Sequence, residues 1–144
     1  MVTPYDVVSK VVDPELRVVT IAELGILRDV AQEGARVVVT ITPTYSGCPA
    51  MDAIREDIRK ALARKGFDDV AVVTKLSPAW STDMITPAGH EALHRAGIAP
   101  PGSTACPHCD SAKTLQISRY ASTPCQALRR CLGCAEPFNA VKTL

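Results

Sequence analysis

The sequence predicts an α+β protein, in which a small two-layer domain with a mainly antiparallel sheet is followed by a C-terminal zinc ribbon. Helical and strand-like patterns alternate over residues 1–100, and four cysteines near the end form two Cys-x-x-Cys pairs. A chain of 144 residues is long enough for one domain with a small appendage.

The first predicted elements are a helix and a β-hairpin. Thr3 is a favourable N-cap for a helix that begins at Pro4, a position that needs no amide donor. Residues 26–32 and 35–42 are runs of β-branched residues separated by a Glu-Gly pair, which is typical of a hairpin.

A longer helix and a third strand follow. Residues 49–65 carry apolar side chains at the spacing of one helix face, and Gly66 is placed to end this helix. Residues 69–76 are predicted to form a strand. Residues 82–97 are expected to form one or two short helices, interrupted by a proline and a glycine.

Domain boundaries follow from a Pro- and Gly-rich stretch, "GIAPPGS". We expect an α+β domain over residues 1–98, a linker over 99–103 and a four-cysteine domain over 104–144. The last segment has few large apolar residues, and folds of this size usually need a metal or disulfides.

Two cysteine pairs in the last segment predict a structural metal site. Zinc favours tetrahedral thiolate coordination, and two Cys-x-x-Cys turns supply four sulfurs when strand-like pieces between them form a hairpin. Four thiolates leave no open position, which argues against catalytic zinc, although they also suit iron or an iron–sulfur cluster. The predicted ligands are Cys106, Cys109, Cys131 and Cys134.

Two further cysteines lie outside these pairs. Cys48 directly precedes Pro49 and a predicted helix, whose N-terminal amides and dipole favour a thiolate. Such a thiolate can be a nucleophile, a redox thiol or a soft metal ligand; the alternative is a cysteine that packs under the helix. For Cys125 we favour a small buried residue over an additional ligand or metal-exchange thiol.

Three acidic residues are candidates for a site near Cys48. Asp13 and Glu15 flank a proline, and Asp83 lies in "AWSTDM". These carboxylates could converge with Cys48 across the first domain. Taken alone, Asp-Pro is a turn signal.

The charge and the N-terminal sequence indicate whether the protein binds nucleic acid and where in the cell it is located. The net charge is +1, divided as −2 over residues 1–100 and +3 over residues 101–144, and neither value argues for nucleic acid by itself. The first residues do not resemble a signal peptide, and no apolar run has the length of a membrane span. We therefore expect a cytoplasmic protein, in which paired cysteines favour metal over disulfides.

One motif is typical of metalloproteases but does not predict one here. His90, Glu91 and His94 fit the pattern H-E-x-x-H, which on a helix places both histidines on one face. The segment is short and bounded by glycines, and the only later acids are Asp110 and Glu136 in the tail. A third ligand and a peptide cleft are therefore not expected.

An ordered series of motifs resembles one known family. The series comprises "DPELRVVTIAELGILRDV", "TPTYSGCPAM", "LSPAWSTDMIT" and "GIAPP", followed by "CPHC", "STPC", "RCLGC" and "EPF". Over nearly the full chain it resembles PaaD, the accessory protein of the phenylacetyl-CoA epoxidase of aerobic phenylacetate breakdown. The N-terminal part is similar to SufT-type iron–sulfur assembly factors.

This resemblance implies a non-catalytic factor that matures an iron or iron–sulfur centre of the multicomponent oxygenase. It implies transient binding of iron or a cluster at Cys48, Asp13, Glu15 and Asp83, and structural zinc at the four paired cysteines. The implied partners are the oxygenase and reductase components and the iron–sulfur assembly machinery. The sequence departs from the family at Arg17 and Glu23, and its end lacks the aromatic residue and cysteine of many members.

Two other functions stay open at this point. A nucleic-acid-binding ribbon would use the basic residues of the tail, with Tyr120 and Phe138 as stacking partners. Its basic residues would be Lys113, Arg119, Arg129, Arg130 and Lys142. A stand-alone thiol enzyme would use Cys48 as its nucleophile.

Overall fold

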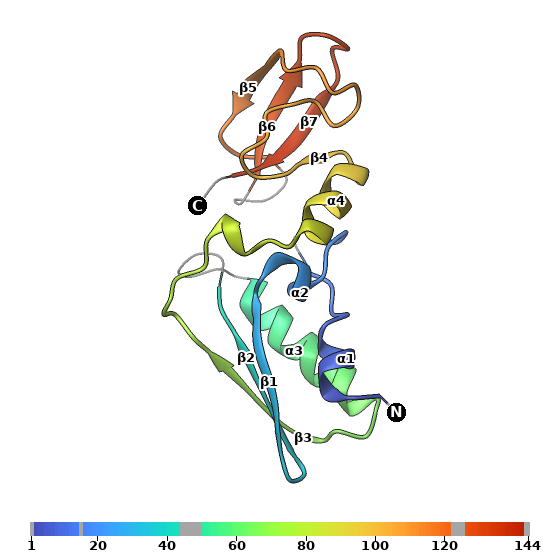
Figure 1. Ribbon diagram of the computed structural model, residues 1–144, viewed down its shortest axis with the longest axis vertical. Helices are drawn as coiled ribbons and strands as arrows, with labels where there is room; N and C mark the ends of the chain where they lie inside the picture. The colour runs from blue at the N-terminus through green and yellow to red at the C-terminus, as the bar shows by residue number, and fades with distance from the viewer. Residues whose placement is uncertain (1, 15, 44–49, 122–125, 143–144) are drawn as a thin grey trace. The chain divides into compact units, whose positions relative to one another are not determined.

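The computed structural model describes residues 2–14, 16–43, 50–121 and 126–142. The chain divides into two compact units, Met1–Thr86 and Pro87–Leu144, and each unit has its own sheet (Figure 1).

The first unit is an α+β domain, as predicted. In chain order it contains α1 (Pro4–Val8), α2 (Ile21–Leu24), β1 (Leu27–Glu33), β2 (Arg36–Ile41), α3 (Ala50–Ala63), β3 (Asp69–Thr74) and the 3₁₀ helix η1 (Thr82–Met84). The sheet has the order β1-β2-β3, with β1 antiparallel and β3 parallel to β2. The sheet is therefore mixed, because α3 is a crossover helix that returns the chain in the direction of β2.

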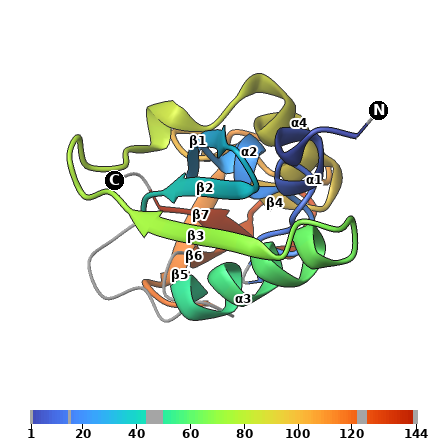
Figure 2. The ribbon, with the colours of Figure 1, turned by 90° about the horizontal axis from the view of Figure 1, so that it is seen from below.

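Two helices pack with the sheet to make the core of this unit. A capping box between Thr3 and Asp6 starts α1 at Pro4, as the sequence predicts. The apolar face of α3 is buried, and Figure 2 shows α3 running along the sheet. The central strand β2 contributes the fully buried Val37 and Val39. Among the described residues, no helix combines the length and apolar character needed to cross a bilayer.

The second unit is built around a sheet with the order β4-β7-β6-β5. Its elements are α4 (Pro87–Arg95), β4 (Ile98–Ala99), β5 (Thr114–Ser118), β6 (Gln126–Cys131) and β7 (Pro137–Val141). Strands β5 and β6 form the antiparallel hairpin that the sequence predicts, and β7 extends it. Strand β4 pairs in parallel with β7.

The units divide earlier in the chain than the boundary that the sequence indicates. Helix α4 and strand β4 belong to the second unit, whereas the sequence pattern placed residues up to 98 in the first domain and a linker at 99–103. The physical reason is long-range pairing, because Ala99 pairs with Ala140 and is completely buried. Pro87 begins α4 instead of interrupting a helix.

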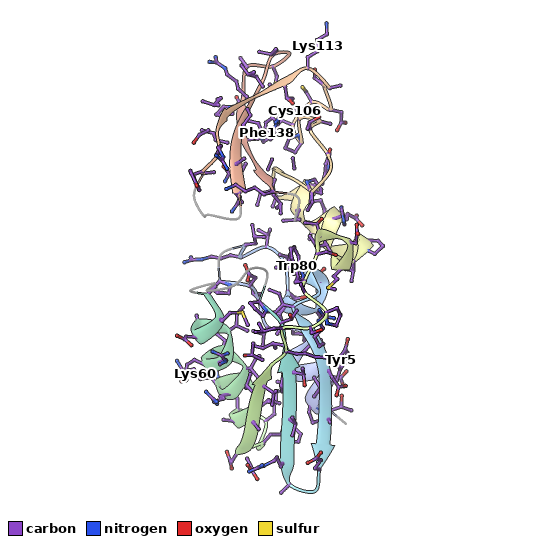
Figure 3. The ribbon with its side chains drawn as sticks, turned by 90° about the vertical axis from the view of Figure 1, so that its left-hand side faces the viewer. Tyr5, Lys60, Trp80, Cys106, Lys113 and Phe138 are labelled. Carbon is purple, nitrogen blue, oxygen red and sulfur yellow. The ribbon has the colours of Figure 1, made fainter. Side chains whose placement is uncertain are left out.

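The buried core of the second unit is small. Figure 3 shows Cys106 and Phe138 directed into this unit, whereas Lys113 points away from it. The cluster of buried residues consists of Ala99, Cys106, Cys131, Phe138 and Ala140. Two of these five, Cys106 and Cys131, are predicted metal ligands, so the predicted metal site and the core share residues.

A close approach at Gly25 yields a test of the first unit. Gly25 ends α2 with a φ of 79°, and a Cβ there would lie 2.5 Å from the carbonyl oxygen of Met84 in η1. Gly34 has a φ of 62°, and a Cβ on this residue would have no atom within 4 Å. We expect Gly25→Ala to lower the free energy of unfolding by about 3 kcal/mol or more, and Gly34→Ala by about 1 kcal/mol. Urea denaturation followed by circular dichroism measures both; equal losses would contradict the contact with η1.

Candidate metal centre and N-terminal site

The second unit brings the four paired cysteines together. Cys106 and Cys109 lie between β4 and β5, Cys131 ends β6, and Cys134 lies in the turn before β7. Their Sγ atoms all lie within 4.8 Å of one another, with 3.8 Å between Cys106 and Cys134 and 3.5 Å between Cys109 and Cys131. Tetrahedral zinc with Zn–S bonds of about 2.3 Å places sulfurs about 3.8 Å apart, so the cluster fits this metal.

Both cysteine turns share one backbone feature. The residue after the second cysteine of each pair is left-handed, with a φ of 62° at Asp110 and 66° at Ala135. Non-glycine residues seldom adopt this conformation, and here it occurs twice at equivalent positions. The repetition indicates that the two turns are built for the same task of presenting two sulfurs to one point.

Backbone amides direct hydrogen bonds at the sulfurs. The amide of His108 donates to Cys106 Sγ (3.4 Å), and the amides of Gly133 and Cys134 donate to Cys131 Sγ (3.2 and 3.3 Å). The Cys134 amide is the main cause that lowers the pKa of the Cys131 thiol to about 6. These donors stabilise negative charge on sulfur before any metal binds.

The neighbouring sulfurs act in the opposite direction on Cys109. The amide of Ser111 lowers the pKa of Cys109, but the other three thiols and partial burial together raise it to about 12. Adjacent sulfurs therefore do not ionise together without a positive charge between them. A divalent cation removes this conflict, which is the electrostatic reason for assigning a metal here.

Asp13, a predicted site residue of the first unit, is held by its own loop. Its side chain is 5% exposed, its Oδ2 accepts a hydrogen bond from the Leu16 amide (2.6 Å), and its amide donates to the Val19 carbonyl (2.9 Å). The carboxylate thus shapes the turn that follows it. Glu15 lies outside the described residues.

The short helix α2 holds the segment of Asp13 in place. Val12 forms a β-bridge with Thr20, and the amide of Ile21 donates to the Val11 carbonyl (2.8 Å). Thr20 and Glu23 form a capping box that starts α2. This helix was not predicted from the sequence, although Thr20 and Glu23 have the spacing of a capping box.

Asp83 lies in a segment that bonds to the other end of α2. Its side chain is exposed on η1. On either side of it, Trp80 Nε1 donates to the Leu24 carbonyl (2.9 Å) and the Thr86 amide donates to the Glu23 carbonyl (2.9 Å). The segments of Asp13 and Asp83 therefore meet the same four-residue helix, one at each end.

Cys48, the predicted thiol of this site, lies outside the described residues. The described chain on its N-terminal side ends in a buried stretch, where the Thr42 amide donates to the Ile26 carbonyl (2.9 Å). Thr42 is 1% exposed, and within the described residues its Oγ1 has no hydrogen-bond partner. Sequence reasoning missed Thr42; the available signal was a polar residue directly after the buried Ile41 of β2.

The H-E-x-x-H segment does not gather a metal site among the described residues. His90 and His94 both lie on α4, and His94 Nε2 contacts Asp110 Oδ1 at 3.5 Å. Within the part of the chain that the structure describes, the four cysteines are the one group of three or more potential ligands.

Comparison with known proteins decides the family. A protein of Escherichia coli (strain K12), provisionally named as a 1,2-phenylacetyl-CoA epoxidase component, is 43% identical over 150 residues, covering 97% of this chain and 91% of that protein. The chain belongs to the PaaD family. Residues 94–142 of this PaaD chain match the PaaD zinc beta ribbon domain, and residues 5–74 match the iron–sulfur cluster assembly protein family.

The N-terminal unit of this PaaD chain has relatives of its own. An Fe-S protein maturation auxiliary factor of Porphyromonas gingivalis (strain ATCC BAA-308 / W83) is 39% identical over 79 residues, covering 53% of this chain and 73% of that protein. The crystal structure of a domain of unknown function (DUF59) from Bacillus anthracis superposes with a TM-score of 0.57 at 33% identity, covering 62% of this chain and 87% of that one.

Loss of the metal should unfold the second unit and spare the first. We expect Cys131→Ser to lower the zinc content below one per chain and to abolish amide protection in β5, β6 and β7, because this residue is both a ligand and a core residue. Hydrogen exchange and zinc analysis measure these effects. Cys125→Ser is the control and should retain one zinc per chain; loss of zinc from that variant would contradict the four-cysteine assignment.

Proposed function

We propose that this PaaD chain is a non-catalytic accessory factor of aerobic phenylacetate degradation, required to mature an iron or iron–sulfur centre of the multicomponent phenylacetyl-CoA 1,2-epoxidase. One observation carries the proposal: a single chain joins a unit that matches the iron–sulfur assembly family to a PaaD zinc ribbon. Its E. coli relative is provisionally named as a component of that epoxidase, and its P. gingivalis relative as an Fe-S maturation factor.

The two units have different tasks toward metals in this proposal. In the second unit, four thiolates close the coordination sphere of zinc, so the metal stays bound and holds the ribbon together. In the first unit, the Cys48 thiol and the three predicted carboxylates bind iron or a cluster as cargo. A site with one sulfur and few oxygen ligands binds weakly enough to release its cargo to a client.

The carboxylates contribute in different ways. Asp13 is buried and accepts a hydrogen bond from the Leu16 amide, so it orients the backbone of its own segment. Asp83 is exposed on η1, so its carboxylate can reach an incoming ion or a client protein. Cys48, Asp13, Glu15 and Asp83 form the proposed transient site.

The proposed partners are the oxygenase and reductase components of the epoxidase and the iron–sulfur assembly machinery. The reductase is a natural recipient, because its electron path resembles that of plant-type ferredoxin systems. The zinc ribbon would give these partners a rigid surface, since the metal removes most of the conformational freedom of so small a unit.

Two specific observations weaken the other candidate functions. Phe138 is 4% exposed in the core and cannot stack on a base, which removes one of the two aromatic residues expected for nucleic-acid binding. All three histidines, His90, His94 and His108, belong to the second unit. The first unit therefore has no histidine of its own to serve Cys48 as a general base.

Substitutions in the transient site should reduce iron transfer without unfolding the chain. We expect Cys48→Ser to retain one zinc and the native circular dichroism spectrum, yet to yield epoxidase with a low iron content. Asp83→Asn should weaken iron binding roughly tenfold, because it removes one anionic ligand or orienting group. Metal analysis of the anaerobically purified protein and of the co-expressed epoxidase measures both effects.

Asp29→Asn is the matched control for Asp83→Asn, since Asp29 is also an exposed carboxylate of the first unit. Its iron binding should equal that of the wild type. Normal iron content and turnover of epoxidase matured with Cys48→Ser would refute the proposed function.

A further inference from the structure

We propose that the second unit contains a binding pocket for a small phosphate-bearing anion, centred on Arg129 and Lys142. A pocket of about 270 Å³ lies against strands β5, β6 and β7 and the loop 102–104. It is lined by Gly102, Ser103, Thr104, Gln116, Ala127, Arg129, Ala140, Val141 and Lys142. No residue of this set belongs to the metal site or to the first unit.

The charge of the pocket is unbalanced. Arg129 and Lys142 both line it, and no acidic residue does. Within the described residues, neither cation takes part in an ion pair. The acids of residues 101–144 are Asp110 and Glu136, and both lie outside the pocket. Two cations that share one concave surface, with no acidic side chain among its described lining residues, attract an anion from solution.

The Arg129 guanidinium is held in position by hydrogen bonds that leave its Nη1 without a partner among the described contacts. Its Nε and Nη2 donate to Thr114 Oγ1 (3.3 and 3.1 Å), and Nη2 also donates to the Thr114 carbonyl (3.3 Å). Thr114 Oγ1 in turn donates to the carbonyl of Thr104, which lines the pocket. Among the described contacts, Nη1 of Arg129 makes no hydrogen bond. The guanidinium is thus oriented in advance, which reduces the entropy lost when it binds an anion.

The other polar groups complete a phosphate-binding set. Lys142 Nζ lies 4.3 Å from the centroid of the Tyr120 ring, so this long side chain has a preferred position. Ser103 Oγ accepts a hydrogen bond from the Ala105 amide (3.4 Å), which leaves its own proton available to donate. Gln116 lies directly opposite Arg129 in the β5–β6 register. A guanidinium, an ammonium and hydroxyl groups together favour the several oxygens of a phosphate.

The size of the pocket favours a small molecule over a polymer. A volume of about 270 Å³ lies just below the range of about 300–1,000 Å³ that is usual for ligand pockets. Three other cations of the same segment, Lys113, Arg119 and Arg130, do not line it, and Lys113 points away from the unit (Figure 3). The two pocket cations therefore form a confined site and not part of an extended basic stripe of the kind that follows a nucleic-acid backbone.

The phosphate could belong to free phosphate, to a nucleotide or to coenzyme A, and calorimetry on the full-length, zinc-loaded chain distinguishes these sources. Inorganic phosphate, ADP and coenzyme A are each titrated at low salt. We expect at least one of them to bind. Lys142→Gln and Arg129→Lys should each weaken its affinity about tenfold or more. Lys142→Gln removes a charge-assisted hydrogen bond, and Arg129→Lys removes the planar guanidinium that can donate two parallel hydrogen bonds. Tightest binding by coenzyme A, ADP or phosphate assigns the source.

Lys113→Gln is the matched control, because it removes the same charge from the same unit outside the pocket. It should bind like the wild type, and all variants should retain one zinc and the thermal unfolding midpoint of the wild type. Lys142→Gln keeps the test decisive if Arg129→Lys perturbs the fold, because no hydrogen bond of the sheet depends on the Lys142 side chain among the described contacts.

Three results would overturn the proposal: no binding of any of the three compounds at millimolar concentration, equal weakening by Lys113→Gln, or binding of DNA or an acidic peptide in place of the small phosphates. Cys48→Ser should leave the affinity unchanged. The experiment can therefore refute the anion pocket without refuting the maturation role, and the iron-transfer experiment can refute the maturation role without refuting the pocket.

Discussion

Electrostatic repulsion among four sulfur atoms is the constraint on which the second unit depends. The atoms lie within 4.8 Å of one another, so they cannot all ionise unless a cation balances them. The backbone prepares for this cation, because amides point at Cys106 and Cys131 and a left-handed residue closes each turn. Cys106 and Cys131 are also two of the five residues in the buried core. We therefore expect metal binding and folding of this unit to be coupled.

The first unit positions its candidate site by main-chain hydrogen bonds around α2. This helix has four residues, yet residues 11–13 bond near its start and the segment of Trp80 and Thr86 bonds to its carbonyls. The backbone, without a metal, thus sets where Asp13 and Asp83 lie. This arrangement fits the proposed role, because a site held by backbone hydrogen bonds can release an ion without unfolding.

In the proposed function, the two units therefore separate permanent from temporary metal binding. Zinc in a closed thiolate shell would stabilise a segment that has few large apolar residues. The same small sheet gathers part of the positive charge of residues 101–144 into one pocket, where Arg129 is held by Thr114. A single ribbon can in this way supply both a rigid docking body and a specific anion site.

Local patterns were sufficient for much of this protein. The cap at Thr3, the buried face of α3, the β5–β6 hairpin, the two cysteine pairs and the PaaD motifs all follow from residues near one another in the chain. The parallel pairing of β3 with β2, the pairing of β4 with β7 and the bond from Trp80 to Leu24 were decided only by the tertiary structure. These contacts join distant residues, and a short sequence window carries no information on which distant partner will be chosen. The pocket at Arg129 and Lys142 has the same origin, whereas Cys48 and Glu15 lie outside the described residues, and their role stays a prediction from sequence.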